Sequence, residues 1–131
     1  MKKWISILIS ALFLGGCTGN SDVYAPQNGS YRQVGMDEAI RIMDEETGYI
    51  ILDVRRPDEF ASGHIPGAIN VPNEEIGDED VPQLPDKDQL ILIYCRSGNR
   101  SKQAAKKLIA LGYTNLIEFG GIMDWPGEIV T

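Results

Sequence analysis

The chain has 131 residues, of which 43% are hydrophobic, and 12 basic against 19 acidic side chains give a formal net charge of −7. This length suits one compact domain with a single core rather than two domains. The acidic balance argues against nucleic acids or anionic lipid head groups as partners, because both carry negative charge themselves.

The N-terminus has the pattern of an export signal. Lys2 and Lys3 precede an apolar run, Trp4 to Leu14, that is shorter than the ~20 apolar residues of a membrane-spanning helix. The ending Leu14-Gly15-Gly16-Cys17 resembles the bacterial lipobox, which implies cleavage before Cys17 and lipidation of that cysteine. An ordinary signal peptide with an incidental cysteine is the alternative. We therefore expect an exported, membrane-anchored lipoprotein that faces the extracytoplasmic side of a bacterial membrane.

Three segments follow from this pattern. We expect a lipoprotein signal peptide at 1–16, a flexible tether at 17–30 and one domain at 31–131. Loss of Lys2 and Lys3 would leave 10 basic against 19 acidic residues, a charge near −9. Of the two cysteines, Cys17 belongs to the lipobox, so Cys95 would be the one remaining thiol and could form no intramolecular disulfide.

Apolar strands alternate with helices along the rest of the chain. We expect strands at 31–34, 49–54, 68–71, 90–95 and 115–119, helices at 36–46, 58–61 and 101–111, and an acidic loop at 73–88. Pro57 opens the second helix, and Gly112 closes the third. On the first helix, Ala39, Ile40 and Met43 would share the buried face.

This alternation is typical of an α/β fold with a doubly wound parallel sheet flanked by helices. Such sheets bind ligands at the carboxyl ends of their strands. Asp53 and Cys95 each end a predicted strand, so both can face that crevice.

The strand that ends at Cys95 runs into a loop rich in hydrogen-bond donors, Arg96-Ser97-Gly98-Asn99-Arg100, which leads into a helix. Backbone N–H groups at a helix N-terminus favour negative charge, and the two arginines add fixed positive charge. Both effects favour a thiolate and can hold an anionic substrate. A lone cysteine after an apolar strand is by default a small core residue, but this loop favours a reactive Cys95.

Four blocks carry a family resemblance, in the family's order, between about Val34 and Glu128. The blocks are Leu52 to Phe60, Gly63 to Pro72, Tyr94 to Ser101, and Gly120-Gly121-Ile122 with Trp125. Together they closely resemble the rhodanese family of single-domain sulfurtransferases. The resemblance implies a rhodanese-like α/β domain.

The resemblance further implies that Cys95 is the nucleophile, and that the five residues after it form the substrate-cradling loop. In the family this cysteine takes a sulfane sulfur from a donor such as thiosulfate, becomes a persulfide, and passes the sulfur to cyanide or another thiophilic acceptor. Loop amides with Arg96 and Arg100 suit a small dianion and its leaving sulfite. Transfer in two steps predicts ping-pong kinetics. We expect neither a cofactor nor a metal.

Four other residues have roles that the sequence leaves open. Asp53 could orient a loop arginine or cap the end of its strand, and Arg55 could form structural or crevice ion pairs. His64 suits a structural turn better than a catalytic base, because persulfide transfer needs no base once the thiolate exists. Trp125 suits the core better than a ligand platform.

Two rival functions come from other classes. A phosphatase or arsenate reductase would share the general architecture, but those proteins use a loop one residue longer than the four residues between Cys95 and Arg100. The shorter loop suits a sulfur atom better than a phosphoryl group. The other rival is a persulfide carrier or a partner-binding module without turnover. Cys95 and both loop arginines argue against an inactive binding domain, whereas a carrier would need all three.

Overall fold

The computed structural model describes residues 29–131 of the chain. Its strands are β1 (Arg32–Gln33), β2 (Ile50–Asp53), β3 (Ile69–Asn70), β4 (Ile91–Cys95) and β5 (Leu116–Gly121). Its helices are α2 (Met36–Glu45), α3 (Pro57–Ser62) and α4 (Asn99–Ala110), with short 3₁₀ turns η2 (Asn73–Glu75) and η3 (Ile122–Asp124). All strands pair in parallel, in the order β1-β5-β4-β2-β3, which confirms the predicted α/β fold.

The expected signal peptide at 1–16, the lipidation site Cys17 and nearly all of the expected tether lie outside the described residues. Within residues 29–131, no helix combines the length and the apolar character that a membrane crossing requires.

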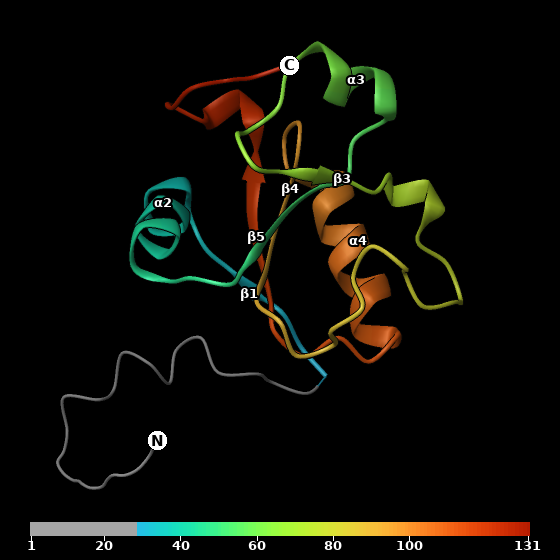
Figure 1. Cartoon of the computed structure of the whole chain (residues 1–131). Helices are drawn as coiled ribbons and strands as arrows, with labels where there is room; N and C mark the ends of the chain where they lie inside the picture. The colour runs from blue at the N-terminus through green and yellow to red at the C-terminus, as the bar shows by residue number, and fades with distance from the viewer. Residues whose placement is uncertain (1–28) are drawn as a thin grey trace, which may run out of the picture.

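Helices cover both faces of the sheet (Figure 1). On one face, α2 buries Ala39 and Ile42 against the sheet, with Met36 and Met43 half-buried beside them. The prediction that Ile40 lies on this buried face was wrong. Buried side chains on a helix recur every three or four residues, and here that repeat leads from Ala39 to Ile42. Ile40 lies at the edge of the stripe and is only partly buried.

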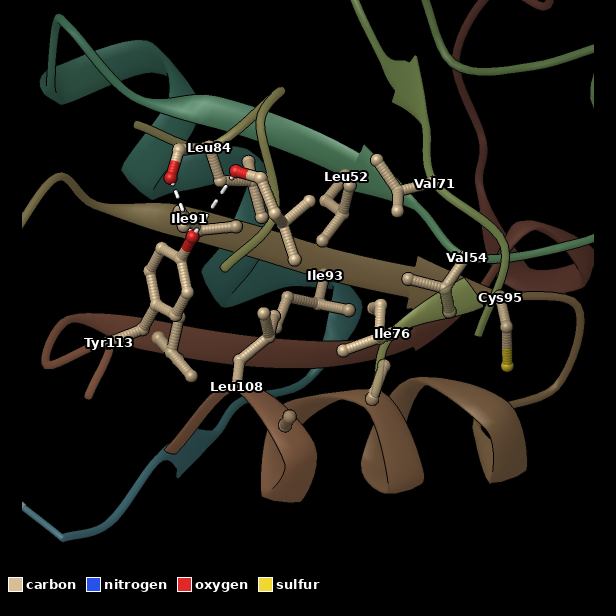
Figure 2. Packing of buried hydrophobic residues seen from close by; sticks show 14 residues of the cluster. Leu52, Val54, Val71, Ile76, Leu84, Ile91, Ile93, Cys95, Leu108 and Tyr113 are labelled. Carbon is tan, nitrogen blue, oxygen red and sulfur yellow. Dashed lines mark hydrogen bonds between the residues drawn. The ribbon is translucent and has the colours of Figure 1, made fainter. Parts of the chain in front are cut away.

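On the other face, α4 packs Ala104, Ala105 and Leu108 against the strands (Figure 2). The acidic loop between η2 and β4 folds over the same cluster. The buried Tyr113 hydroxyl donates a hydrogen bond of 2.6 Å to the Leu84 carbonyl and fixes this loop in place, as Figure 2 shows. A long acidic loop thus closes part of the core.

β4 lies at the centre of the sheet, and all five of its residues are buried. Side chains alternate between the two faces, so Ile91, Ile93 and Cys95 join the α4 cluster, while Leu92 and Tyr94 join the α2 cluster. Cys95 therefore lies on the α4 face, at the carboxyl edge of the sheet. The chain enters β1 at the opposite, amino edge (Figure 1).

The pairing of β4 with β5 contains a bulge. Ile93 lies opposite Glu118, but Cys95 lies opposite Gly121, so β5 carries one extra residue at this point. Gly120 accommodates it with a φ of 98°, a left-handed conformation that favours glycine. β5 consequently continues two residues beyond the predicted end at residue 119, alongside Cys95.

Candidate active site

The Cys95 thiol lies at the end of β4 and is 1% exposed. Its Sγ accepts a hydrogen bond of 3.0 Å from the Gly98 N–H and lies 3.5 Å from the Ser101 Oγ. Figure 2 shows the sulfur beyond the packed part of the cluster, directed toward the first turn of α4. The strand, the loop and the helix N-terminus thus converge on one sulfur atom.

Opposing effects set the pKa of Cys95. Burial raises this pKa, but the hydrogen bond with the Ser101 hydroxyl and those from the backbone N–H groups of Ser101, Gly98 and Ser97 outweigh burial and hold it below its ordinary value. A lowered pKa gives more thiolate, which is the nucleophilic form of cysteine. The arrangement is that of a reactive thiol.

The loop after Cys95 owes its shape to two glycines. Gly98 takes a φ of 114° at the N-cap of α4, and this conformation directs its N–H at Sγ. Gly121 of β5 lies directly beneath the loop, where any β-carbon would overlap the Arg96 carbonyl group. The Arg96 carbonyl also accepts a hydrogen bond of 3.3 Å from the Met123 N–H. The side chains of Arg96, Ser97 and Asn99 are exposed around the loop.

Arg100 is held by a residue that the sequence analysis did not single out. Its guanidinium donates two hydrogen bonds, of 2.6 and 3.2 Å, to the Glu59 carboxylate of α3. Glu59 also accepts a 3.0 Å hydrogen bond from the Arg56 N–H, as in a capping box. These contacts, above all those from Arg100, lower the pKa of Glu59 to about 2. In the sequence, Glu59 is recognisable only as an acidic residue in the first turn of a short predicted helix.

Asp53 and Arg55 form a buried ion pair at the end of β2. The Asp53 carboxylate is fully buried and accepts hydrogen bonds from the Arg55 backbone at 2.9 Å and its Nη2 at 2.7 Å. Arg55 also donates to the Gly63 carbonyl at 2.7 Å. Asp53 therefore orients Arg55, two residues along, rather than either loop arginine. The pair ties the end of β2 to the turn after α3.

His64 and Trp125 have structural surroundings. His64 Nδ1 lies 2.9 Å from the Phe60 carbonyl, and its ring stacks on Phe60 at 3.7 Å. Its backbone pairs with Val130 in an antiparallel bridge. Trp125 packs against the α2 cluster and donates from Nε1 to the Glu128 carbonyl at 2.9 Å. Both placements agree with the structural roles that the sequence favoured.

A second carboxylate, Glu118 of β5, lies behind the thiol. The fully buried Ser101 hydroxyl donates a hydrogen bond to the Glu118 carboxylate, which also accepts a 3.0 Å bond from the Gly120 N–H. Glu118 is itself only 2% exposed. The sequence did carry a signal: an acidic residue stands two positions after Leu116 in an apolar strand, so it must point inward on the same face.

No group of three or more His, Cys, Asp or Glu side chains within residues 29–131 is arranged to hold a metal ion.

Comparison with known proteins adds four findings. The family model described as "Rhodanese-like domain" matches residues 36–128. Thiosulfate sulfurtransferase PspE of Escherichia coli is 37% identical over 73 residues, which cover 56% of this chain and 70% of that protein. Putative sulfur carrier protein YrkF of Bacillus subtilis is 30% identical over 100 residues, 76% of this chain and 53% of that protein. A solved structure titled "rhodanese with anions from E. coli" aligns with a TM-score of 0.58 and 34% identity, covering 63% of this chain and 98% of that one.

Some relatives are much longer than the matched region. Adenylyltransferase and sulfurtransferase UBA4 of Candida albicans is 38% identical over 95 residues, which are 67% of this chain but only 22% of that protein. The chain thus corresponds to less than a quarter of this larger relative.

Proposed function

The chain belongs to the rhodanese-like family, and from this membership we propose that it is a sulfurtransferase that works through a persulfide on Cys95. The sulfur donor would be a small anion such as thiosulfate, and the acceptor a thiol or cyanide. The observation that carries the proposal is the Cys95 thiol, buried at a strand end, with its pKa lowered by its hydrogen bond with the Ser101 hydroxyl and by those from the loop N–H groups. Relatives named as thiosulfate sulfurtransferases support the same chemistry.

The proposed reaction has two half-reactions. The Cys95 thiolate attacks the outer sulfur of thiosulfate, a new Sγ–S bond forms, and the donor's S–S bond breaks with its electron pair leaving on sulfite. An acceptor then attacks the outer sulfur of the persulfide, and Cys95 leaves again as thiolate. Because the donor product departs before the acceptor reacts, ping-pong kinetics follow.

We assign the binding of the anionic donor to Arg96, Ser97, Gly98, Asn99 and Arg100. The N–H groups of this loop already converge on Sγ, so they can bind negative charge that develops on the transferred sulfur. Arg96 is exposed at the rim, where it can meet an incoming anion. Arg100 adds positive charge near the thiol from its position on Glu59. The Asp53–Arg55 pair supports the end of β2 beside this loop.

A persulfide carrier is the second candidate. The match to a relative named as a putative sulfur carrier favours it. A carrier would be loaded on Cys95 by the same first half-reaction but would release sulfur only to a specific protein acceptor. Multiple turnovers with thiosulfate and cyanide would identify an enzyme, whereas loading without turnover would identify a carrier.

Intact-mass measurement tests the persulfide directly. The full chain carrying Cys17→Ser keeps Cys95 as its one thiol, since the sequence has two cysteines. Incubation with thiosulfate should add one sulfur atom, and cyanide should remove it. Cys95→Ser in the same background should show no adduct, while its unfolding transition stays close to that of the parent. An adduct that persists in Cys95→Ser, or a folded parent that never gains sulfur from thiosulfate, would contradict the proposal.

We also propose that the chain is exported and anchored by lipid on Cys17. This proposal rests on the residue pattern from Lys2 to Cys17 alone.

A further inference from the structure

Cys95, Ser101 and Glu118 form a continuous row of hydrogen-bonding groups. The Cys95 thiol donates toward the Ser101 Oγ at 3.5 Å, and the Ser101 hydroxyl donates in turn to the Glu118 carboxylate. All three residues are buried, with exposed fractions of 2% or less. β4, α4 and β5 contribute one residue each, and the bulge in β5 follows immediately after Glu118.

The Ser101 hydroxyl has one proton to give. The Glu118 carboxylate is its closest acceptor, and the Gly98 and Gly120 carbonyls lie farther away, at 3.0 and 3.4 Å. This limits what Ser101 can do for Cys95. While that proton is donated to an ionised Glu118, Ser101 can only accept from the thiol. Ser101 can donate to a Cys95 thiolate only when Glu118 carries a proton and donates it to Ser101. Both protonation patterns keep the hydrogen bond between Cys95 and Ser101 and the one between Ser101 and Glu118. They differ only in the position of one proton along each of these bonds.

From this geometry we propose that Glu118 is the positioning residue of the site, and that it accepts the Cys95 proton through Ser101. The thiol proton moves from Sγ to the Ser101 Oγ as the serine proton moves to Glu118 Oε2. Cys95–SH and Glu118–COO⁻ become Cys95–S⁻ and Glu118–COOH. No electrons are transferred, and the buried group of three residues keeps a single negative charge throughout.

Charge conservation is the advantage of this arrangement. Ionisation of Cys95 by loss of its proton to solvent would place two negative charges in a buried region. Within residues 29–131, no Lys, Arg or His side chain forms a salt bridge with Glu118 that could offset the second charge. A proton transfer from Cys95 to Glu118 avoids two negative charges in the same buried region.

Other charged groups surround the thiol, and their effects are distinct. Arg100 contributes positive charge near Cys95, but it is paired with Glu59. Lys102 of α4 reaches toward Gly98, since a β-carbon added there would lie 3.3 Å from its Nζ and 3.8 Å from Glu118 Oε2. Lys102 thus places a positive charge in the neighbourhood of Glu118, without a salt bridge to it. Arg96 is exposed in the loop, and Asp53 on the neighbouring strand is paired with Arg55. These groups can shift the titration of Cys95, but none of them forms a hydrogen bond with the Ser101 hydroxyl.

The inference rests on the proposed function for its use in catalysis. In the first half-reaction, Glu118 would keep the proton while Cys95 attacks the donor. In the second, Cys95 leaves as a thiolate, and the proton can return to it from Glu118 through Ser101. The cycle therefore ends in its starting protonation state without exchange of a proton with solvent.

Alkylation kinetics test the proton transfer without any sulfur donor. Cys95 is alkylated with iodoacetamide, a neutral electrophile, in the full chain carrying Cys17→Ser, from about pH 5 to about pH 9. Because a shared proton makes the thiolate fraction independent of pH between the two apparent pKa values of the pair, the rate should reach a plateau at low pH. In Glu118→Gln the rate should instead fall about tenfold per pH unit below the pKa of Cys95, with no plateau at low pH.

Three further variants separate proton transfer from a structural effect. Ser101→Ala should also lose the plateau, and Ser101→Thr, which keeps the hydroxyl, should retain it. Glu45→Gln, the same substitution at an exposed position on α2, should match the parent profile. If Glu118→Gln fails to fold, the comparison of Ser101→Ala with Ser101→Thr still distinguishes proton transfer from a structural effect.

A parent profile with no plateau at low pH would overturn the inference, as would a low-pH plateau that survives Glu118→Gln or Ser101→Ala. A parallel sideways shift of the whole profile would also overturn it, because it would show an electrostatic effect alone. These outcomes do not depend on thiosulfate. A protein that shows the plateau but never gains sulfur would therefore refute the proposed function while leaving the proton transfer standing.

Discussion

The Arg100 guanidinium lies near two groups that carry or can carry negative charge, the Glu59 carboxylate and the Cys95 thiol. Glu59 binds it through two hydrogen bonds and is the main reason that the pKa of Arg100 is raised, and the charge of Cys95 adds to the same effect. Glu59 thus fixes the position of a positive charge near the thiol and also offsets part of it. The strength of anion binding at this loop depends on the balance between the two side chains.

We therefore predict that Arg100→Ala weakens donor binding. It removes a positive charge and takes from the Glu59 carboxylate its closest cation, leaving the contacts with Arg56. The KM for thiosulfate should therefore rise about tenfold, or about 1.4 kcal/mol. Steady-state transfer from thiosulfate to cyanide measures this change. The double variant Arg100→Ala/Glu59→Gln should recover part of the loss. An unchanged KM in Arg100→Ala would remove the arginine from the binding site.

At this scale, the sequence predicted the residues that are contiguous and missed those that folding brings in. Cys95 and its loop could be identified because strand, glycine and arginines follow one another directly. Glu59 contacts Arg100 across 41 positions, and Glu118 contacts Ser101 across 17. Such contacts depend on how α3 and β5 lie against the loop, which no local pattern specifies.

At the scale of elements, β5 forms the surface on which the reactive loop rests. The bulge carries the strand forward beside Cys95, and Gly121 brings its backbone against the Arg96 carbonyl. The order and type of the predicted elements were confirmed, because the longer ones have clear apolar periodicity and the short helix α3 is marked by Pro57 at its start and Gly63 at its end. The bulge was not predicted, since an extra residue in one strand is defined only by its pairing with another.

Gly121→Ala should displace the loop. Its β-carbon would overlap the Arg96 carbonyl, so the backbone must shift, at a cost of about 1–3 kcal/mol in unfolding free energy. Sulfur loading from thiosulfate should fall together with stability. Gly77→Ala is the matched control, because a β-carbon at Gly77 has no neighbour within 4 Å. Normal loading in Gly121→Ala would show that the loop tolerates this shift.

At the scale of the whole molecule, the contact between α3 and the N-terminus of α4 makes stability depend on pH. The folded-state pKa of Glu59 is about 2, below its ordinary value of 4.5, so the ionised form is favoured by folding. Its stabilising contribution is fully present above about 4.5 and is lost as the pH falls through about 2.

Glu59→Gln should accordingly unfold more easily than the parent near pH 6, and the difference should shrink toward zero as the pH falls to about 2. Urea unfolding of both proteins across this range measures the difference. Glu45→Gln, at an exposed position on α2, should show no such trend. A difference that stays constant with pH would assign the effect of Glu59→Gln to something other than its charge.

Anchoring is also a property of the whole chain. If Cys17 carries the lipid, Cys17→Ala should move the protein from the membrane fraction to the soluble fraction of the cells that produce it. Immunoblots of the two fractions, with the parent as control, give the distribution. A variant that stays wholly with the membrane would contradict a lipid anchor at this residue.

The chain enters the sheet at the amino edge of β1, whereas the Cys95 loop opens at the opposite, carboxyl edge (Figure 1). A domain anchored through residues that precede β1 would hang from the bilayer by the edge farther from its thiol. The anchor and the Cys95 loop would then lie at opposite ends of the domain, so the attachment itself would not cover the persulfide. Dissolved anions and water-soluble thiol proteins could approach the loop without meeting the anchored end.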